Sequence, residues 1–167
     1  VIPIPWSPDA LRITEKRNIF PLRSFRNGLY EVQDAASQMV SRLLDPHPGM
    51  RVVDACAGEG SKTLHLAALM HNTGKIIALD TQEWRLKQLK KRAGKAGADT
   101  IETRLITSSK TYKRLYGTAD RLLLDVPCSG SGTLRKNPDI KWKLSAEDFT
   151  RLKILQLELL EKYHPIV

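Results

Sequence analysis

Four short apolar runs divide the middle of the chain, and segments with helical or loop character separate them. The runs occupy residues 51–55, 75–80, 101–106 and 121–125. Apolar runs of this length between turn residues are typical of strands that are buried on both faces. Because strands that alternate with helices form βαβ units, the pattern predicts an α/β fold with a mainly parallel sheet.

Four other stretches have apolar residues at helical spacing. The first begins at Asp34 and is stopped by the sequence DPHPG, and the second runs from Ser61 to a glycine stop at Gly74. The third ends in GKAGAD, and the fourth, from Ser145 to Tyr163, has capping-box spacing between Ser145 and Asp148. Three of these helices have a predicted core side. It consists of Ala36, Met39, Val40, Leu43 and Leu44 in the first helix, and of Trp84, Leu86, Leu89 and Ala93 in the third. In the fourth helix it consists of Phe149, Leu152, Leu155, Leu159 and Tyr163.

The ends of the chain differ from its middle. Residues 1–33 are proline-rich and weakly periodic, which predicts an N-terminal arm or linker with short pieces of strand. Residues 34–167 hold the predicted α/β domain. The chain starts with Val1 rather than Met, and it ends at Val167 just after a long helical pattern. We therefore expect a piece of a longer protein, with a domain that is incomplete at its C-terminal side.

Composition changes the picture mainly through charge. The 167 residues are 41% hydrophobic and 27% charged, as in an ordinary globular protein with one core. The formal net charge of +9 favours a polyanionic partner, with nucleic acid as the first candidate. A basic surface that only keeps the protein dissolved explains the charge equally well.

Other sequence features narrow the class of protein. No apolar run reaches the roughly 20 residues that cross a bilayer, and the first residues do not have the charged, apolar and small-residue regions that indicate a signal peptide. The two cysteines have different surroundings and make no disulfide framework, so we expect a reducing cytoplasm. We predict no membrane contact, no metal site and a monomer.

The sequence VVDACAGEGSKT (residues 52–63) is the first chemical signal, because a strand leads through two glycines into a helix. Backbone N–H groups at such a helix start can face a ligand. Asp80 ends the next strand about 20 residues later, where related folds place an acid that binds ribose hydroxyls. The third glycine of a dinucleotide fingerprint is Thr63 here, and Ser61 replaces the glycine that a P-loop has before Lys62.

A glycine turn with a strand-end acid and no diphosphate signature suits S-adenosylmethionine, which has a ribose but no phosphate. Two structural alternatives stay open at this point. The glycines also fit a plain tight turn, and Asp80 also fits a helix N-cap with Glu83 three residues later.

The second chemical signal is the sequence DVPCSGSG, in which Cys128 closely follows the strand-end Asp125. Ligands of parallel α/β sheets gather at the carboxyl ends of the strands. Asp54, Asp80 and Asp125 all lie at such ends, which predicts one shared site. A thiol there acts as a nucleophile when nearby cations lower its pKa, and the candidate cations are Lys62, Arg135 and Lys136. As an alternative, Cys128 is a small filler in a turn.

Cations and aromatic residues alternate in RKNPDIKWK (residues 135–143), directly after the Pro-Cys loop. Such a mixture suits contact with phosphates and stacking on bases. We predict that RNA binds Arg135, Lys136, Lys141 and Trp142. The lysines of the third predicted helix fit a solvated surface instead.

Three segments together resemble the NOL1/NOP2/Sun family of RNA cytosine-5 methyltransferases. They are YEVQDAASQM, DACAGEGSKT and DVPCSGSGTLRKNPDIKW, and the resemblance runs from about Gly28 to the last residues. It implies a Rossmann-like methyltransferase core that uses S-adenosylmethionine to methylate carbon 5 of a cytosine in ribosomal RNA, or in transfer RNA.

The resemblance also implies roles for individual residues. Asp125 is expected between cofactor and cytosine, Lys62 near the reaction centre, and Cys128 as a helper in breakdown of the covalent adduct. The attacking cysteine belongs to a later Thr-Cys motif, expected beyond Val167, so this piece by itself is expected to be inactive. The residues expected to bind the cofactor are Cys56, Ala57, Gly58, Glu59, Gly60, Ser61, Lys62, Asp80, Arg85 and Asp125.

The chain departs from the family pattern at two places. The turn reads Gly-Glu-Gly-Ser where the family usually has Ala/Gly-Pro-Gly-Gly, and Ser108 or Ser109 stands where an aspartate usually contacts the adenine. These departures keep a non-catalytic RNA-binding module of the same fold as one alternative. A methyltransferase that modifies an amino group is another. The missing third glycine argues against a nicotinamide dehydrogenase.

Overall fold

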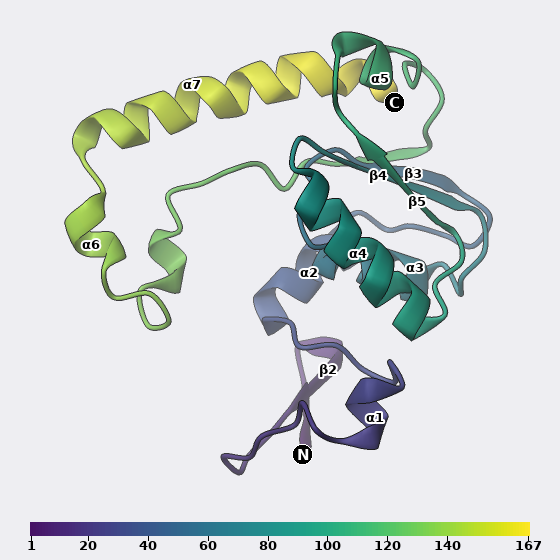
Figure 1. The fold of residues 1–167 in the computed structure, drawn as a ribbon, viewed down its shortest axis with the longest axis vertical. Coiled ribbons are helices and arrows are strands. Elements are labelled where there is room, and N and C mark those ends of the chain that lie inside the picture. The colour runs from purple at the N-terminus through teal and green to yellow at the C-terminus, as the bar shows by residue number, and fades with distance from the viewer.

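A parallel sheet of four strands forms the centre of the computed structural model, which describes all 167 residues (Figure 1). The order across the sheet is β5-β4-β3-β6, and all three pairings are parallel, as the apolar runs predict. After β5 the chain returns to the far side of β3, which makes the β3–β6 edge the switch point where such sheets bind ligands. The strands are β3 (Arg51–Asp54), β4 (Lys75–Asp80), β5 (Ile101–Leu105) and β6 (Arg121–Leu123).

Helices cover both faces of the sheet. On one face α3 (Ser61–Leu69) and α4 (Glu83–Ala96) pack against Val52, Ile76 and Ala78. On the other face α5 (Ser109–Lys113), the end of α7 (Ala146–Tyr163) and η2 (His164–Ile166) pack against Val53, Ile77 and Leu79. Side chains of neighbouring strand residues point to opposite faces, so strands covered on both sides must be apolar throughout. That requirement explains the continuous apolar runs.

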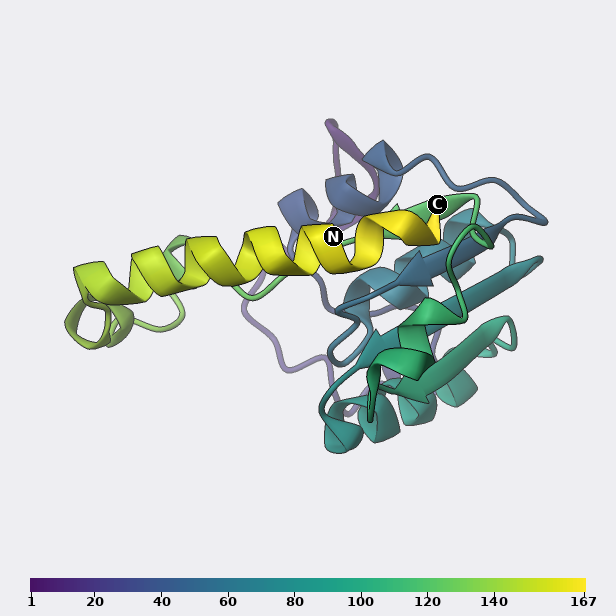
Figure 2. The same cartoon turned by 90° about the horizontal axis from the view of Figure 1, so that it is seen from above.

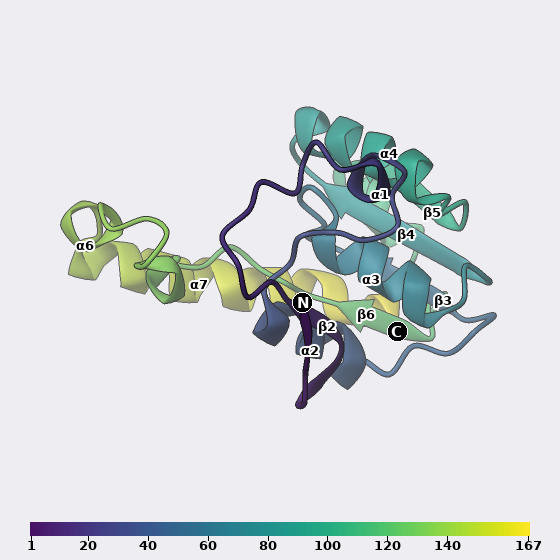
Figure 3. The ribbon, with the colours of Figure 1, turned by 90° about the horizontal axis from the view of Figure 1, so that it is seen from below.

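The arm folds into a hairpin of β1 (Ile2–Ile4) and β2 (Ser7–Arg12), followed by α1 (Arg23–Arg26). It returns along the side of α3 and α4 before α2 (Ala35–Leu43) begins (Figure 3). Asp34 caps α2 by accepting a hydrogen bond from the Ala36 amide. Asp9 of the hairpin accepts both hydrogen bonds of the Arg42 guanidinium, at 2.6 and 2.8 Å. The predicted division at residue 33 stays a prediction, since the arm also contacts the domain.

Several helix predictions need correction, and Ala36, expected on the core side of α2, is exposed. Trp84 is 53% exposed because it precedes Leu86 by two residues, which puts it about 200° away around α4 from the buried side. Leu43 is 81% exposed, since the buried side of α2 centres on Val40, Ser41 and Leu44. The helix that begins at Ser61 ends at Leu69, before the predicted glycine stop, because His71 and Asn72 adopt left-handed backbone angles.

The segment between β6 and α7 extends away from the sheet (Figure 2). It contains η1 (Ser131–Thr133) and α6 (Ile140–Lys143). The first turns of α7 extend with it, so Phe149, a predicted core residue, is 51% exposed. Only the C-terminal end of α7 packs on the sheet, through Leu159 and Tyr163. None of the helices is both long and apolar enough to cross a membrane.

We predict that the capping box of α7 controls local opening of its first turn. The Ser145 hydroxyl accepts from the Asp148 amide, and the Asp148 carboxylate accepts from the Ser145 amide. Ser145→Ala should cost about 1 kcal/mol and speed exchange of the amides in the first two turns about fivefold, as measured by hydrogen exchange. Ser108→Ala is the control, because Ser108 makes no capping hydrogen bond. Equal exchange in wild type and Ser145→Ala would contradict the prediction.

Candidate functional site

A cavity of about 850 Å³ lies at the carboxyl ends of β3, β4 and β6. The turn of residues 54–62 forms one wall, and Asp80, Thr81 and Arg85 form a second. The loop from Asp125 to Cys128 borders it near the switch point. All the predicted cofactor-binding and catalytic residues therefore line one cavity. Their roles remain predictions, but the expected convergence of Asp54, Asp80 and Asp125 is present.

The glycine turn is shaped by its contact with α4. Gly60 has a φ of +83°, and a Cβ placed on it would lie 2.0 Å from the Leu89 Cδ1 atom. A residue with a side chain at position 60 would therefore combine backbone strain with a steric clash. The Gly60 carbonyl accepts from the Leu64 amide and so starts α3. Ser61 and Lys62, the first residues of this helix, line the cavity.

Asp80 supports the same turn from the end of β4. Its Oδ2 atom accepts from the Gly58 amide at 2.9 Å, and Oδ1 accepts from the Gln82 amide at 2.8 Å. The N-cap of α4 is Gln82, so the alternative that Asp80 is the N-cap of this helix is wrong. The predicted capping partner Glu83 instead pairs with Lys87. Asp80 is buried against the turn that it holds.

Asp54 is a buried carboxyl group for which the sequence suggested a position but no role. Its Oδ2 atom accepts from the Thr63 hydroxyl at 2.7 Å, whereas Oδ1 is buried without a hydrogen-bond partner. Burial raises the pKa of Asp54 to about 6; the bond from Thr63 opposes the rise and the nearby Asp125 adds to it. Asp54 therefore exchanges a proton near neutral pH inside the cavity wall. The sequence signal for this buried carboxyl group was an acidic residue at the end of an apolar strand.

Lys62 and Asp125 form an ion pair between two segments of the cavity wall. The Lys62 Nζ atom lies 2.6 Å from Asp125 Oδ2, and Lys62 comes from the first turn of α3 while Asp125 follows β6. The Lys62 side chain is largely buried and that of Asp125 is half exposed. The pair fixes the carboxylate at the edge of the cavity. The sequence predicted both residues as catalytic but did not predict their contact.

The two cysteines have different environments. Cys128 is exposed at the cavity, in a loop that is tied to α7 because the Pro127 carbonyl accepts from the Gln156 amide group. Burial raises the pKa of the Cys56 thiol to about 12, and the carboxylates of Asp54 and Asp80 add to the rise. Cys56 therefore stays protonated and is a packing residue of the cavity wall. Cys128 is the accessible thiol.

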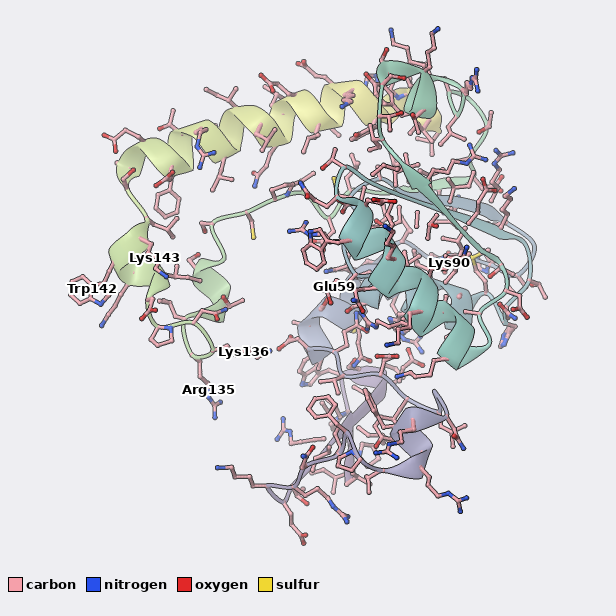
Figure 4. The ribbon with its side chains drawn as sticks, viewed as in Figure 1. Glu59, Lys90, Arg135, Lys136, Trp142 and Lys143 are labelled. Carbon is pink, nitrogen blue, oxygen red and sulfur yellow. The ribbon has the colours of Figure 1, made fainter.

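The predicted RNA-binding residues lie outside the cavity. Arg135, Lys136 and Trp142 occupy the segment that extends from the sheet (Figure 4). Trp142 is 80% exposed, and the Lys141 ammonium lies 4.8 Å from the centre of its ring. Of the three cations suggested as neighbours of Cys128, only Lys62 shares its cavity. Arg135 and Lys136 do not line it, because the extended segment carries them away.

One predicted departure from the family pattern is also located by the structure. Ser108 and Ser109 do not line the cavity, and Ile106 does. Ile106, the last residue of the apolar run that forms β5, therefore lines the cavity near the place where the family pattern has an aspartate that contacts the adenine. An aliphatic side chain there offers packing but no hydrogen bond.

The model of the family described as 16S rRNA methyltransferase RsmB/F matches residues 41–167. The chain belongs to the RsmB/F family. This membership confirms the resemblance to NOL1/NOP2/Sun methyltransferases. A relative in Bacillus subtilis, a probable ribosomal RNA small subunit methyltransferase B, is 36% identical over 160 residues. The match covers 95% of this chain but 36% of the relative, so the chain spans about a third of its length.

Solved structures confirm the predicted Rossmann-like methyltransferase fold for this RsmB/F chain. The crystal structure of PH0851 is 37% identical and matches with a TM-score of 0.93 over 99% of this chain and 38% of that one. NSun6 from Pyrococcus horikoshii, solved with SFG, is 25% identical and matches with a TM-score of 0.63 over 76% of this chain and 37% of that one. The same element order therefore recurs in longer proteins.

Sequence reasoning missed two walls of the cavity in this RsmB/F chain. The arm and the start of α2 contribute one, and the last turns of α7 contribute the other. The first stretch lies within the YEVQDAASQM motif, which signalled the family but no particular site residue, and the last turns of α7 carry no glycine, strand-end acid or other local signal of a site. The missed residues are Val32, Gln33, Asp34 and Ser37, and Leu155, Leu159, Lys162 and Tyr163.

We predict a pH-dependent contribution of Asp54 to stability. Its pKa in the folded chain, about 6, exceeds the value of about 3.9 for an exposed aspartate, so folding favours the protonated form. This stabilisation is complete below about pH 4 and is lost as the pH rises through about 6. The free energy of unfolding of wild type relative to Asp54→Asn should therefore fall by about 2 kcal/mol between about pH 4 and pH 7.5.

Urea unfolding of both proteins across this range measures the effect. Asp99→Asn serves as the control, because Asp99 is exposed and makes no hydrogen bond or ion pair. The difference between wild type and this control gives the baseline for replacing an exposed aspartate. A difference for Asp54→Asn that is flat, or that rises with pH, would show that folding does not raise the pKa of Asp54.

Proposed function

We propose that the chain is the cofactor-binding part of an S-adenosylmethionine-dependent RNA cytosine-5 methyltransferase that acts on ribosomal RNA. The supporting observation is the convergence of two features on one cavity. One is the glycine turn held by Asp80, and the other is the Asp125–Lys62 pair beside Cys128. The names of the relatives, which refer to the small-subunit ribosomal RNA, support this substrate over transfer RNA.

The cavity fits the cofactor in size and charge. Its volume of about 850 Å³ lies within the range of about 300–1,000 Å³ that is usual for small-molecule sites. Asp54, Asp80 and Asp125 give the walls acceptors for an ammonium group and for ribose hydroxyls. Carboxylates repel a diphosphate, which argues against a dinucleotide. We assign Asp80 to the ribose and the turn of residues 56–62 to the rest of the cofactor.

The cofactor, when bound, supplies an electrophilic methyl group. Carbon 5 of cytosine becomes a nucleophile only after a thiolate adds to carbon 6, and a base must later remove the carbon 5 proton. We assign Asp125, held by Lys62, to contact the cytosine ring. Cys128 lies three residues further along the same loop and is assigned to breakdown of the adduct. Arg85 lies at the cofactor side of the cavity wall.

RNA binding is assigned to the segment that extends from the sheet. Arg135, Lys136 and Lys141 supply positive charge, and Trp142 supplies an exposed ring on which a base can stack. The segment follows the Pro-Cys loop directly, so RNA held there can deliver an unstacked base towards Cys128. The proposal treats the protein as a cytoplasmic monomer.

We predict that the chain binds S-adenosylhomocysteine and that Asp80→Asn weakens this binding at least about tenfold. The substitution removes the charge that accepts from Gly58 and, in the proposal, from the ribose, at a cost of about 1.4 kcal/mol or more. Isothermal calorimetry measures the affinity, and Asp99→Asn is the control. Absence of binding to the folded wild-type protein, verified by circular dichroism, would contradict the assignment of the cofactor.

We also predict a salt-dependent contribution of the extended segment to RNA affinity. The double variant Arg135→Gln/Lys136→Gln should weaken binding of a 16S rRNA fragment and reduce the slope of log K against log salt by about 1 to 2. Filter binding at several salt concentrations measures both quantities. The double variant Lys90→Gln/Lys91→Gln, on the exposed side of α4, removes the same charge elsewhere. Equal slopes for the two variants would mean that the charge effect is not local.

A further inference from the structure

One arginine of α4 connects the N-terminal arm to the glycine turn. The Arg92 Nη1 atom donates to the Glu59 carbonyl at 2.7 Å. Its Nη2 atom donates to the Glu31 carboxylate at 3.1 Å and lies 3.3 Å from the Ser61 hydroxyl oxygen. A single guanidinium group thus holds a residue of the arm and two residues of the turn. The Arg92 and Glu31 side chains are about four-fifths buried, so solvent screens this ion pair less than one at the surface.

The arm is in close contact with the same helix next to this group. The Lys95 ammonium lies 3.1 Å from the second Glu31 oxygen and 3.9 Å from the centre of the Phe25 ring. Gly28 has a φ of +72°, and a Cβ placed on it would lie 2.2 Å from the Lys95 carbonyl oxygen. The arm backbone therefore lies directly on the last turns of α4, and only glycine fits at position 28.

The turn contacts α4 on the other side of Arg92. The Leu89 side chain fills the space where Gly60 lacks a Cβ, and Arg92 is one helical turn further along. Figure 4 shows Glu59 beside α4, with Lys90 on the same helix. The arm and the turn thus use one short surface of α4, and neither can move far without disturbing Arg92.

The residues that follow Glu31 continue directly into the cavity wall. Val32, Gln33 and Asp34 line the same cavity as the turn that Arg92 holds. An arm that separates from α4 would open this wall and also remove one partner of Arg92. The two walls that a ligand contacts are therefore mechanically and electrostatically connected.

We propose that Arg92 is a positioning residue that couples docking of the N-terminal arm to the binding-competent shape of the glycine turn. The inference rests on the proposed function, in which this cavity holds S-adenosylmethionine. Coupling of this kind is reciprocal: the docked arm raises the affinity for the cofactor, and the bound cofactor stabilises the docked arm. A contact of the arm with RNA or with another part of the protein would then regulate cofactor affinity.

Binding of S-adenosylhomocysteine to single and double variants tests the coupling. Arg92→Met should raise the Kd about tenfold and Glu31→Gln about threefold to fivefold, within the usual range of coupling. The double variant should weaken binding by less than the product of the two single effects, because Arg92→Met already lacks the Arg92–Glu31 contact and only the Lys95–Glu31 contact remains to be lost. Arg92→Lys should recover part of the affinity. Lys90→Met, an exposed substitution on the same helix, is the control and should bind like wild type.

Gly28→Ala provides a variant that leaves Arg92 and the turn unchanged. It should undock the arm through the clash with Lys95 and weaken binding by a factor similar to that of Glu31→Gln. Gly49→Ala is its matched control, since Gly49 also has a left-handed φ, of +88°, but a Cβ there meets nothing within 4 Å. Hydrogen exchange of residues 28–34 gives the reciprocal readout: the ligand should slow exchange in wild type and much less in Arg92→Met.

The outcomes separate the inference from the proposed function. Wild-type affinity in both Glu31→Gln and Gly28→Ala would overturn the coupling, even if Arg92→Met binds weakly, because Arg92 would then only support the turn. If Arg92→Met does not fold, the other two variants decide the question. A folded wild-type protein that binds no S-adenosylhomocysteine would overturn the proposed function and the coupling together.

Discussion

The parallel direction of the strands is the constraint on which the site depends. Strands that are covered by helices on both faces must be apolar along their length, so polar residues are confined to their ends. Because β3, β4 and β6 run the same way, Asp54, Asp80 and Asp125 reach a single edge although up to 71 positions separate them in the sequence. The sheet therefore brings three carboxyl groups together, and the cavity is the space between the loops that follow them.

This concentration of acids is stable because each has a different partner. Asp80 accepts from two backbone amides, Asp125 pairs with Lys62, and Asp54 binds one hydroxyl and retains its proton up to about pH 6. Adjacent carboxylates that all remained ionised in a buried wall would repel one another. The structure instead distributes the charge, with a raised pKa at Asp54 and an ion pair between Lys62 and Asp125.

The cavity is completed by segments that belong to neither the sheet nor its loops. The arm closes one side through the surface of α4, where Arg92 and Lys95 bind Glu31. The end of α7 closes another, through Leu155, Leu159 and Tyr163. Residues distant in the sequence hold the arm and the end of α7 in place. Because Arg92 binds both the arm and the glycine turn, a change in the arm can reach the turn. Ser61, one of the residues at which the turn departs from the family pattern, contributes a partner for Arg92.

The sequence by itself determined the parallel sheet, the glycine turn and the set of residues at the strand ends, because periodicity and strand-end acids are local signals. It did not determine which face Trp84 and Leu43 would occupy, since a side chain's burial depends on what packs beside its helix. Only the tertiary structure decided the Lys62–Asp125 contact, the raised pKa of Asp54 and which residues of the arm line the cavity. Each of these arises from groups far apart in the chain, whose distances and desolvation exist only once the chain has folded.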